Sequence, residues 1–197
     1  MFLCGIDEAG RGPLAGPVCA AAVILPEGYA SNILNDSKKM NASSRECARG
    51  IICLEATAWG LGWASASEID EINIHNATLL AMKRAFFAAQ TGADQRKTLG
   101  ATFAAGKIRA VVDGRFAPDI PISCEAMIKA DSKVPAVMAA SIMAKTARDR
   151  LMEYYSIFYP QYGYERHKGY PTKAHREAIH RYGPSPIQRK SFNVLLD

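Results

Sequence analysis

Apolar and polar positions along the first 155 residues follow the patterns of strands and helices in alternation. Strands are predicted where short apolar runs are bounded by turn residues, over 2–9, 18–25, 57–66, 108–112 and 122–129. Helices are predicted from an apolar face at helical spacing over 74–90, and from start and stop signals over 43–56, 134–155 and 173–182. Residues 92–106, which are polar and contain several glycines, predict a loop. The pattern indicates an α/β domain.

The ends of these elements carry their own signals. Ser43, with Glu46 three residues later, forms a capping box for the first helix. Ser132 is the expected cap of the long helix that follows it, and Thr172 is that of the last helix, which Gly183 would end. The segment between the first two strands is too short for a helical crossover, so these strands are expected to pair antiparallel.

The excess of positive charge lies near the end of the chain. Residues 141–197 hold 10 Lys or Arg against 5 Asp or Glu, whereas the first 140 residues hold 14 of each. Seven tyrosines are interleaved with these cations: Tyr154, Tyr155, Tyr159, Tyr162, Tyr164, Tyr170 and Tyr182. A nucleic-acid-binding surface needs cations for phosphates and rings for sugars or bases, although a solvated basic face with half-buried tyrosines has the same composition. We expect an α/β domain over 1–155 and a basic helical extension over 156–197 packed on it as one structural unit.

The composition is that of a globular protein, with 49% apolar residues. The longest apolar run near the start, 18–25, is too short to cross a bilayer, and no basic leader precedes it. The five cysteines are an odd number without a C-x-x-C pair, which indicates neither disulfides nor a zinc site. We expect a cytoplasmic protein without a membrane partner.

Four acidic residues stand where predicted elements begin or end. Asp7 and Glu8 close the first strand, Asp113 closes the strand at 108–112, and Asp131 precedes the long helix. Because sites in α/β sheets collect at the carboxyl ends of strands, these acids are expected to converge. Clustered carboxylates repel one another unless a cation neutralises them, and oxygen ligands favour Mg²⁺ or Mn²⁺. Two such ions about 3.5–4 Å apart are suited to phosphodiester hydrolysis.

Each acid also has a purely structural interpretation. Asp131 would be favourable near a helix N-terminus, Asp113 could belong to a turn with Gly114, and Glu8 could pair with Arg11. Other site types lack their motifs, since no dinucleotide fingerprint, phosphate loop or nucleophile elbow is present. The three histidines near the end of the chain lack zinc spacing, and surface positions or phosphate contacts are expected for them: His167, His175 and His180.

Several segments together resemble bacterial ribonuclease HII, of the type 2 ribonuclease H family. The first spans 5–17 and reads GIDEAGRGPLAGP. The others follow in family order: NDSKK at 35–39, EID at 68–70, VDG at 112–114, KADS at 129–132, AASI at 139–142, AK at 144–145, RDR at 148–150, YGY at 162–164, HKGYPT at 167–172 and RKSF at 189–192. The resemblance therefore spans nearly the whole chain.

This resemblance implies a ribonuclease H-like fold: a five-stranded mixed sheet flanked by helices, with a small helical C-terminal extension. It implies a metal-dependent endonuclease that hydrolyses the RNA strand of RNA–DNA hybrids. It further implies cleavage 5′ of single ribonucleotides embedded in duplex DNA, by two-metal-ion hydrolysis that leaves a 3′-hydroxyl and a 5′-phosphate. The expected cofactor is Mn²⁺ or Mg²⁺. The expected partners are RNA–DNA hybrids and ribonucleotide-containing DNA, bound by a monomer.

Residue by residue, the resemblance places the catalytic metals on the four acids, Asp7, Glu8, Asp113 and Asp131. It assigns recognition of the ribose 2′-hydroxyl to the backbone of Gly10, Arg11 and Gly12, and stacking on the next sugar to Tyr170. The 2′-hydroxyl distinguishes RNA from DNA, and glycines let the backbone approach it closely. Further candidates for substrate binding are Lys38, Arg45 and Lys145.

Three departures from the family pattern lie outside the acids, and for one of them, Val137-Met138 in place of the more usual isoleucine or serine, no effect is expected. Ala130 stands where glycine is usual, which could alter the backbone at Asp131, and Gln188 stands where histidine is common, which affects a peripheral phosphate contact. The related type III ribonuclease H is an alternative, but it usually carries an additional N-terminal domain, for which no segment precedes Phe2. A catalytically silent nucleic-acid-binding module is the alternative from another class, and the four intact acids do not favour it.

Overall fold

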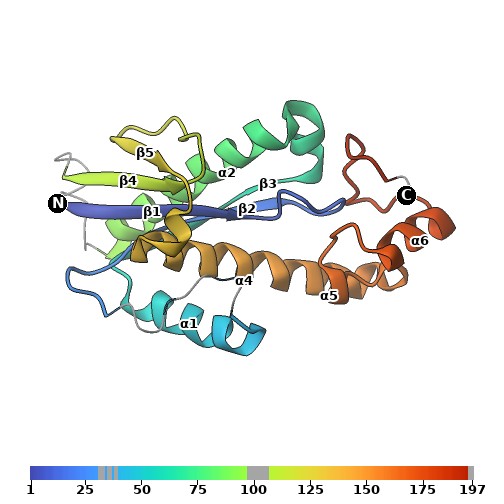
Figure 1. Ribbon diagram of the computed structural model, residues 1–197, viewed down its shortest axis with the longest axis horizontal. Helices are drawn as coiled ribbons and strands as arrows, with labels where there is room; N and C mark the ends of the chain where they lie inside the picture. Colours follow the sequence, from blue (N-terminus) through green and yellow to red (C-terminus); the bar gives the residue numbers. More distant parts are fainter. Residues whose placement is uncertain (31–33, 35–36, 38–39, 97–106, 195–197) are drawn as a thin grey trace.

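A computed structural model shows the fold and describes residues 1–30, 34, 37, 40–96 and 107–194. Its centre is a five-stranded mixed sheet with the strand order β3-β2-β1-β4-β5 (Figure 1). The strands are β1 (Phe2–Ala9), β2 (Val18–Ile24), β3 (Ala58–Ala64), β4 (Ile108–Asp113) and β5 (Cys124–Met127). β2 pairs antiparallel with β1 and β3, whereas β4 pairs parallel with β1 and β5. The five predicted strands and the antiparallel first pair are confirmed.

Helices cover both faces of this sheet. The helices of the described residues are α1 (Ala42–Glu55), α2 (Ala66–Arg96), α4 (Pro135–Phe158), α5 (Tyr164–His167) and α6 (Lys173–Tyr182), with short 3-10 turns η2 (Ala130–Ser132) and η3 (Pro160–Tyr162). Figure 1 shows α2 on one face and α4 on the other, with α1 beside α4. α4 extends beyond the sheet, and α5 and α6 lie near its far end. The predicted α/β architecture is confirmed.

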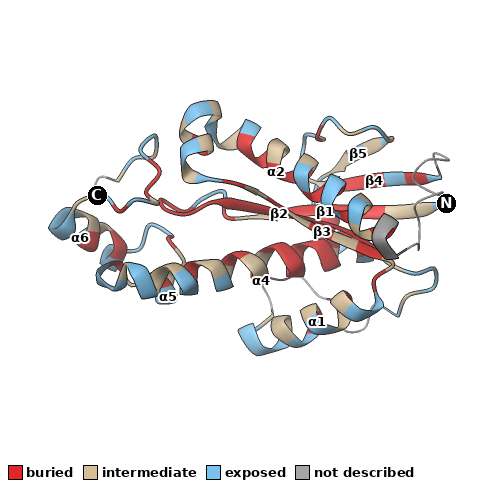
Figure 2. Ribbon diagram, turned by 180° about the vertical axis from the view of Figure 1, so that it is seen from behind, coloured by how far each residue is buried: buried red, intermediate tan, exposed pale blue. Residues whose placement is uncertain are grey.

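β2 lies inside the sheet and is buried along its whole length (Figure 2). Its alternating side chains enter two different cores, because successive residues of a strand point to opposite faces. On the α2 side are Val18, Ala20, Ala22 and Ile24, and on the α4 side are Cys19, Ala21 and Val23. A strand buried on both faces needs apolar residues without alternation, which is why 18–25 reads as one continuous apolar run.

The glycines of β3, which disfavour a strand by propensity, are explained by the close approach of α2. A Cβ atom at Gly62 would lie 2.1 Å from the carbonyl oxygen of Ala81, and one at Gly60 would lie 2.2 Å from the amide nitrogen of Ala89. Only glycine therefore allows the helix to rest on this strand. α2 itself has a kink at Asn73, whose φ of 65° is non-helical.

Several boundaries differ from the sequence-based expectations, among them the start of α2 at Ala66 instead of residue 74. α1 is capped by Asn41, whose side chain accepts a hydrogen bond from the Ser44 amide at 2.8 Å, so the predicted cap at Ser43 is wrong. The predicted cap at Ser132 is also wrong, because this residue lies in η2 and its hydroxyl donates to the Lys129 carbonyl. α2 continues to Arg96, into the predicted loop, and residues 97–106 lie outside the described part.

The C-terminal segment after α4 forms a small cluster around the end of that helix. Tyr162 and Tyr164 stack, with ring centroids 5.5 Å apart, and pack with Met152. The predicted cap of α6 is confirmed, since the Thr172 hydroxyl accepts from the amide of His175. The predicted division into a domain over 1–155 and an extension over 156–197 stays a prediction. α4 continues across this boundary to Phe158. Within the described residues, no helix has both the length and the apolar composition of a membrane span.

The expectation of surface histidines is confirmed for His180, which is exposed, but is wrong for the other two. His175 is fully buried and His167 is half-buried, so neither is a free surface residue. Both rings belong to the C-terminal cluster, where Tyr164 makes edge contacts with them. Their spacing of eight residues carries no local signal of burial, since the turn between them brings them together.

Two buried arginines hold the loop between β1 and β2, residues 10–17 (loop 10–17). Arg148 of α4 donates to the carbonyl oxygens of Pro17 and Ala15 at 2.9 and 3.1 Å. Arg189 donates to three more carbonyl oxygens, those of Gly16, Arg11 and Gly10. The two side chains are 1% and 0% exposed, and none of the ion pairs found among the described residues includes them. Their charge is thus satisfied by backbone dipoles.

Backbone hydrogen bonds also hold loop 10–17. The amide of Arg189 donates to the Leu14 carbonyl at 2.9 Å, and the amide of Gly16 donates to the Ile187 carbonyl at 2.8 Å. The C-terminal segment thus lies against loop 10–17 as a short antiparallel bridge. Because burial makes each unpaired carbonyl costly, the conformation of the loop depends on these donors.

We predict that Arg189→Met lowers the free energy of unfolding by about 3 kcal/mol, because three carbonyl oxygens, two of them buried, lose their donors. Urea unfolding followed by circular dichroism measures this change. The matched control is Arg150→Met, since Arg150 forms an exposed ion pair with Glu46 and its loss is expected to cost less than about 1 kcal/mol. Equal losses in the two variants would contradict the structural role of Arg189.

Candidate active site

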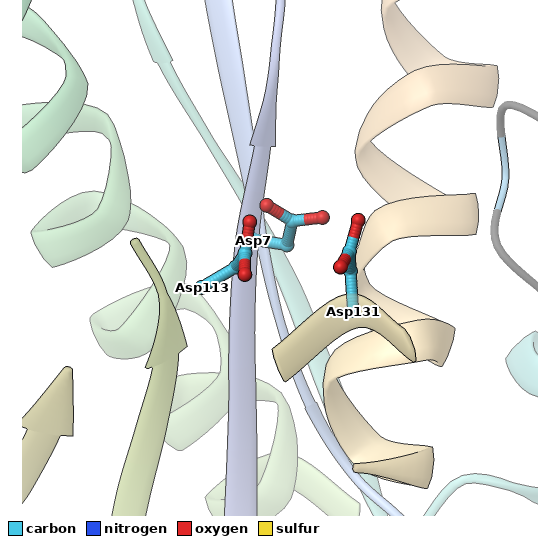
Figure 3. A group of neighbouring side chains, drawn as sticks. All are labelled: Asp7, Asp113 and Asp131. Atoms are coloured by element: carbon cyan, nitrogen blue, oxygen red, sulfur yellow. The ribbon is translucent and has the colours of Figure 1, made fainter. Parts of the chain in front are cut away.

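The register of two parallel strands places two acids side by side. β1 and β4 pair Gly5 with Val111 and Ile6 with Val112, so the next residues, Asp7 and Asp113, meet where both strands end. Asp131 reaches the same place from η2 (Figure 3). One carboxylate oxygen from each of the three acids lies within 4.8 Å of the others. The predicted convergence is therefore present for these three residues.

A backbone hydrogen bond fixes the third acid relative to the second. The amide of Ala130 donates to Oδ1 of Asp113 at 2.8 Å, which ties η2 to the end of β4. Ala130 does not have a positive φ, and its methyl group is buried with Val111 and Val137. Alanine thus fits a position where the family pattern has glycine, and the expected change of the backbone at Asp131 stays a prediction.

Glu8 lies beside this group but outside it. It follows Asp7 in β1, and its Oε1 accepts from Arg11 at 3.3 Å, which is the pairing that the structural interpretation suggested. Its Oε2 is buried and has no hydrogen-bond partner within the described residues. A buried carboxylate oxygen without a donor is costly, so this atom is suited to accept a ligand.

The electrostatics of the site favour a cation. Burial raises the pKa of Asp7 well above its ordinary value, and the charges of Glu8 and Asp113 raise it further, while a hydrogen bond from Ser141 opposes them. Burial also raises the pKa of Glu8, against the opposing effect of Arg11. A divalent ion would remove this repulsion. The donors are all carboxylate oxygens, so the residues present fit Mg²⁺ or Mn²⁺.

The predicted recognition residues line one small cavity next to the acids. It has a volume of about 200 Å³ and is lined by Glu8, Ala9, Gly10, Arg11, Gly12, Ser37, Ser141, Lys145 and Tyr170. Gly10 has a φ of 98°, and a Cβ atom there would clash with the Arg148 side chain, 1.9 Å away. The ring of Tyr170 lies over Gly12, where the position of a Cβ would be 3.7 Å from Cε1. The loop backbone and the ring thus enclose one cavity.

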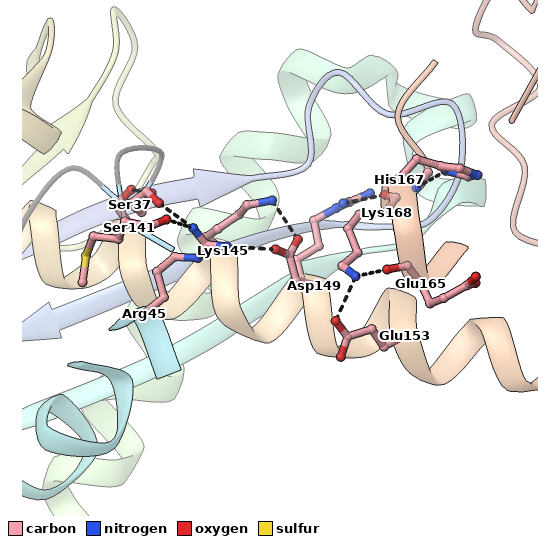
Figure 4. Close-up of polar contacts among 12 residues, drawn as sticks. Ser37, Arg45, Ser141, Lys145, Asp149, Glu153, Glu165, His167 and Lys168 are labelled. Atoms are coloured by element: carbon pink, nitrogen blue, oxygen red, sulfur yellow. Dashed lines mark hydrogen bonds and ion pairs between the residues drawn. The ribbon is translucent and has the colours of Figure 1, made fainter. Parts of the chain in front are cut away.

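The other predicted substrate-binding residues do not all line this cavity. Lys145 lines the cavity, with Nζ 5.7 Å from the centroid of the Tyr170 ring, and forms an ion pair with Asp149 at 2.8 Å. Arg45 reaches the same carboxylate from α1 at 3.9 Å but lines a neighbouring groove instead (Figure 4). Lys38 lies outside the described residues.

Two serines belong to the site although sequence reasoning did not single them out. The hydroxyl groups of Ser37 and Ser141 lie 2.8 Å apart in a buried position, and both line the cavity. Ser141 also contacts the carboxylate of Asp7. Both serines lie inside the motif segments 35–39 and 139–142. Their pairing across 104 residues is a long-range contact that no local pattern reveals.

Gln188, another departure from the family pattern, is not at the periphery. Its side chain is buried, and its backbone forms the bridge to Ala15 in loop 10–17. A direct phosphate contact from this residue would require its side-chain amide to reach the surface. The expectation that this departure puts only a peripheral phosphate contact in doubt stays a prediction.

Comparisons with known proteins agree with these observations. A family model described as Ribonuclease HII matches residues 4–195. A ribonuclease HII of Treponema denticola is 55% identical over 197 residues, which cover 98% of each chain. Among solved structures, a ribonuclease H2 from Pyrococcus horikoshii OT3 has a TM-score of 0.70 at 23% identity and covers 98% of this chain and 95% of its own.

A type III enzyme shares the fold over part of its length. The structure of Bst-RNase HIII in complex with Mn²⁺ has a TM-score of 0.71 at 18% identity, and the match covers 98% of this chain but 68% of that one. The family model and the relative at 55% identity distinguish between the two types. The chain belongs to the ribonuclease HII family, whose members are metal-dependent endonucleases that act on RNA–DNA hybrids.

Proposed function

We propose that this chain cuts the RNA strand of RNA–DNA hybrids and also cuts 5′ of single ribonucleotides embedded in duplex DNA, leaving a 3′-hydroxyl and a 5′-phosphate. The observation that supports this is the continuity of two parts of the site. Glu8 adjoins Asp7 of the acidic group and also lines the cavity formed by loop 10–17 and Tyr170. A phosphate beside the acids would therefore have its ribose next to the loop.

The acids would hold the metal ions. Asp7, Asp113 and Asp131 offer converging oxygens, and the buried Oε2 of Glu8 offers one more. When bound, two divalent ions would supply an activated water molecule and stabilise the leaving oxygen. The Asp7 carboxylate is held by Ser141, and Asp113 by the Ala130 amide, so both ligands are oriented before any ion arrives.

Recognition of the 2′-hydroxyl would fall to the loop backbone. Arg189 already donates to the carbonyl oxygens of Gly10 and Arg11, which fixes their orientation. No hydrogen bond between described residues uses the amide N–H of Arg11 or Gly12, so these donors remain for the ribose. A side chain at Gly12 would stand between the loop and Tyr170 and would narrow the space for a sugar.

Tyr170 and Lys145 would contact the rest of the substrate. Tyr170 is 39% exposed, and Lys145 and Arg148 lie 5.7 and 5.9 Å from the centroid of its ring. A partly exposed ring near two cations is suited to stack on a deoxyribose while Lys145 contacts the adjacent phosphate. Arg45 would reach a phosphate farther along the backbone, from the groove beside α1.

The decisive experiment compares a duplex containing one ribonucleotide with the same duplex made of DNA only. We expect cleavage 5′ of the ribonucleotide with Mg²⁺ or Mn²⁺, no cleavage of the DNA control, and loss of activity with a chelator. Specific binding without cleavage under any of these conditions would favour the silent binding module instead.

We predict that Asp7→Asn and Asp113→Asn each reduce the cleavage rate by about 1,000-fold, because each removes a charged ligand. Hybrid binding, measured by fluorescence anisotropy, should change little, since the loop and Tyr170 are unaltered. Asp119→Asn is the control of matched chemistry, since the Asp119 side chain is 95% exposed and pairs only with Lys83 among the described residues. Activity in Asp7→Asn equal to that of the control would exclude the proposed role.

Asp7→Asn, which is predicted to lower activity, should raise the stability of the metal-free protein. Because the folded state raises the pKa of Asp7, wild-type stability should fall as the pH rises above the ordinary aspartate range and the carboxylate ionises. Asp7→Asn removes this cost and should raise the Tm at pH 7.5 by at least about 2 °C. Added Mn²⁺ should raise the Tm of the wild type more than that of Asp7→Asn. Differential scanning calorimetry in chelator and in Mn²⁺ tests both statements.

Tyr170→Ala should reduce cleavage at ribonucleotide–DNA junctions by about tenfold or more, because base or sugar stacking is worth roughly 1–3 kcal/mol. The Tm should change little, because the ring is partly exposed. Tyr182→Ala is the matched control, since Tyr182 is 49% exposed and lies on α6. A large drop in Tm with equal loss on all substrates would instead assign Tyr170 to packing.

A further inference from the structure

Two histidines without a role in the proposed function stack on each other next to the Tyr170 backbone. The ring centroids of His167 and His175 are 4.4 Å apart, and the rings are inclined by 16°. His167 ends α5, and His175 lies in the first turn of α6. The pair therefore joins the two helices that flank residues 168–172.

Hydrogen bonds assign a neutral tautomer to each ring. The amide of Gly169 donates to Nδ1 of His167 at 3.2 Å, so Nε2 of this ring carries the proton and donates to the Tyr162 carbonyl at 2.8 Å. Nδ1 of His175 faces the Tyr170 carbonyl at 3.0 Å and must be the donor there. Burial is the main cause that lowers the pKa of His175 to about 4, which keeps the ring neutral at neutral pH.

These contacts complete the anchoring of the segment 168–170. The Lys168 carbonyl accepts from Arg148, the Gly169 carbonyl from the Leu14 amide, and the Tyr170 amide donates to the His167 carbonyl. The Tyr170 carbonyl accepts from His175 and from the Thr172 amide. Every backbone carbonyl of the segment is therefore held. His175 is thus the side chain that donates to the carbonyl of Tyr170, and the ring of Tyr170 lines the cavity.

The ring of Tyr170 itself has weaker restraints. It contacts Gly12 and lies near Lys145 and Arg148, and it has no hydrogen bond between described residues. Its distance from loop 10–17 is thus set mainly through its backbone. A displacement of about 1 Å in a positioning group can lower the reaction rate by a large factor. The hydrogen bond from His175 to the Tyr170 carbonyl is therefore expected to affect substrate recognition.

We propose that His175, backed by the stacked ring of His167, is a positioning residue that sets the location of Tyr170 over the 2′-hydroxyl-reading loop. This inference rests on the proposed function, because it assumes that Tyr170 contacts the substrate. The alternative is that the histidine pair only fills the C-terminal cluster beside Tyr164. The two differ in whether the effect of His175 passes through Tyr170.

Two amide variants separate the donor from the ring. His175→Asn places an amide nitrogen near the position of Nδ1 and keeps a donor for the Tyr170 carbonyl, whereas His175→Gln carries its amide farther out and does not. His175→Phe is a third variant that keeps the ring but has no donor. We expect kcat/KM on a single-ribonucleotide duplex to fall about tenfold in the Gln and Phe variants and to be largely restored in the Asn variant.

A double-mutant cycle with Tyr170→Ala provides the main test. If His175 acts through Tyr170, His175→Gln and His175→Phe should cause no further loss of kcat/KM in the Tyr170→Ala background. Tenfold losses in both backgrounds would assign His175 to the fold, and so would unfolding of both donor-lacking variants by thermal melting. Wild-type activity in both variants would also overturn the inference.

Failure of the inference and failure of the proposed function give different results. If the wild type does not cut the single-ribonucleotide duplex, the proposed function is wrong. If the wild type and Tyr170→Ala behave as proposed but His175→Gln and His175→Phe equal the wild type, only the role of His175 is wrong.

Discussion

The parallel pairing of β1 with β4 is the constraint on which the site depends. It sets two carboxylates side by side at the end of neighbouring strands, in surroundings that disfavour their charge. A shift of one residue in this register would turn Asp113 to the other face of the sheet. α4 packs closely on β1 of this pair, since a Cβ atom at Gly5 would lie 2.1 Å from the carbonyl carbon of Ala136. The rigid sandwich thus keeps together groups that repel one another.

The carboxylates and the cavity are supported in different ways. The acids belong to strands and to a turn tied to a strand, so their spacing follows from the sheet. Loop 10–17 has no such ladder and is held by guanidinium groups from two distant parts of the chain. Arg148 also donates to the Lys168 carbonyl, which connects this loop to the segment that carries Tyr170. Chemistry and recognition can therefore respond independently to a substitution.

Much of the fold could be predicted from the sequence, because its signals are local. The apolar runs of β1, β2 and β4 and the cap at Thr172 each lie within a few residues of the element that they define. The acids could be located because the ends of parallel strands share one edge of a sheet. The family resemblance then supplied the proposed role of the glycine loop, which spacing alone left open.

What the sequence did not reveal depends on distant partners. Ser43 is a residue type that often caps helices, but the N-cap of α1 is Asn41, two residues earlier. The burial of His175 and the approach of α2 to Gly62 follow only once the helices are placed. Glu8 satisfies the sequence pattern of a metal ligand, yet in the fold it pairs with Arg11 and stands outside the three converging oxygens.

The bridge between Ala15 and Gln188 has a consequence for synthesis of the protein. The acids are all present once residue 131 has left the ribosome, and the sheet can form from residues up to 127. Loop 10–17, however, receives its donors from Arg189 only after nearly the whole chain has been translated. A nascent chain therefore contains all four acids long before it contains the arginine that holds loop 10–17, so the support of this loop is the last part of the site to be synthesised.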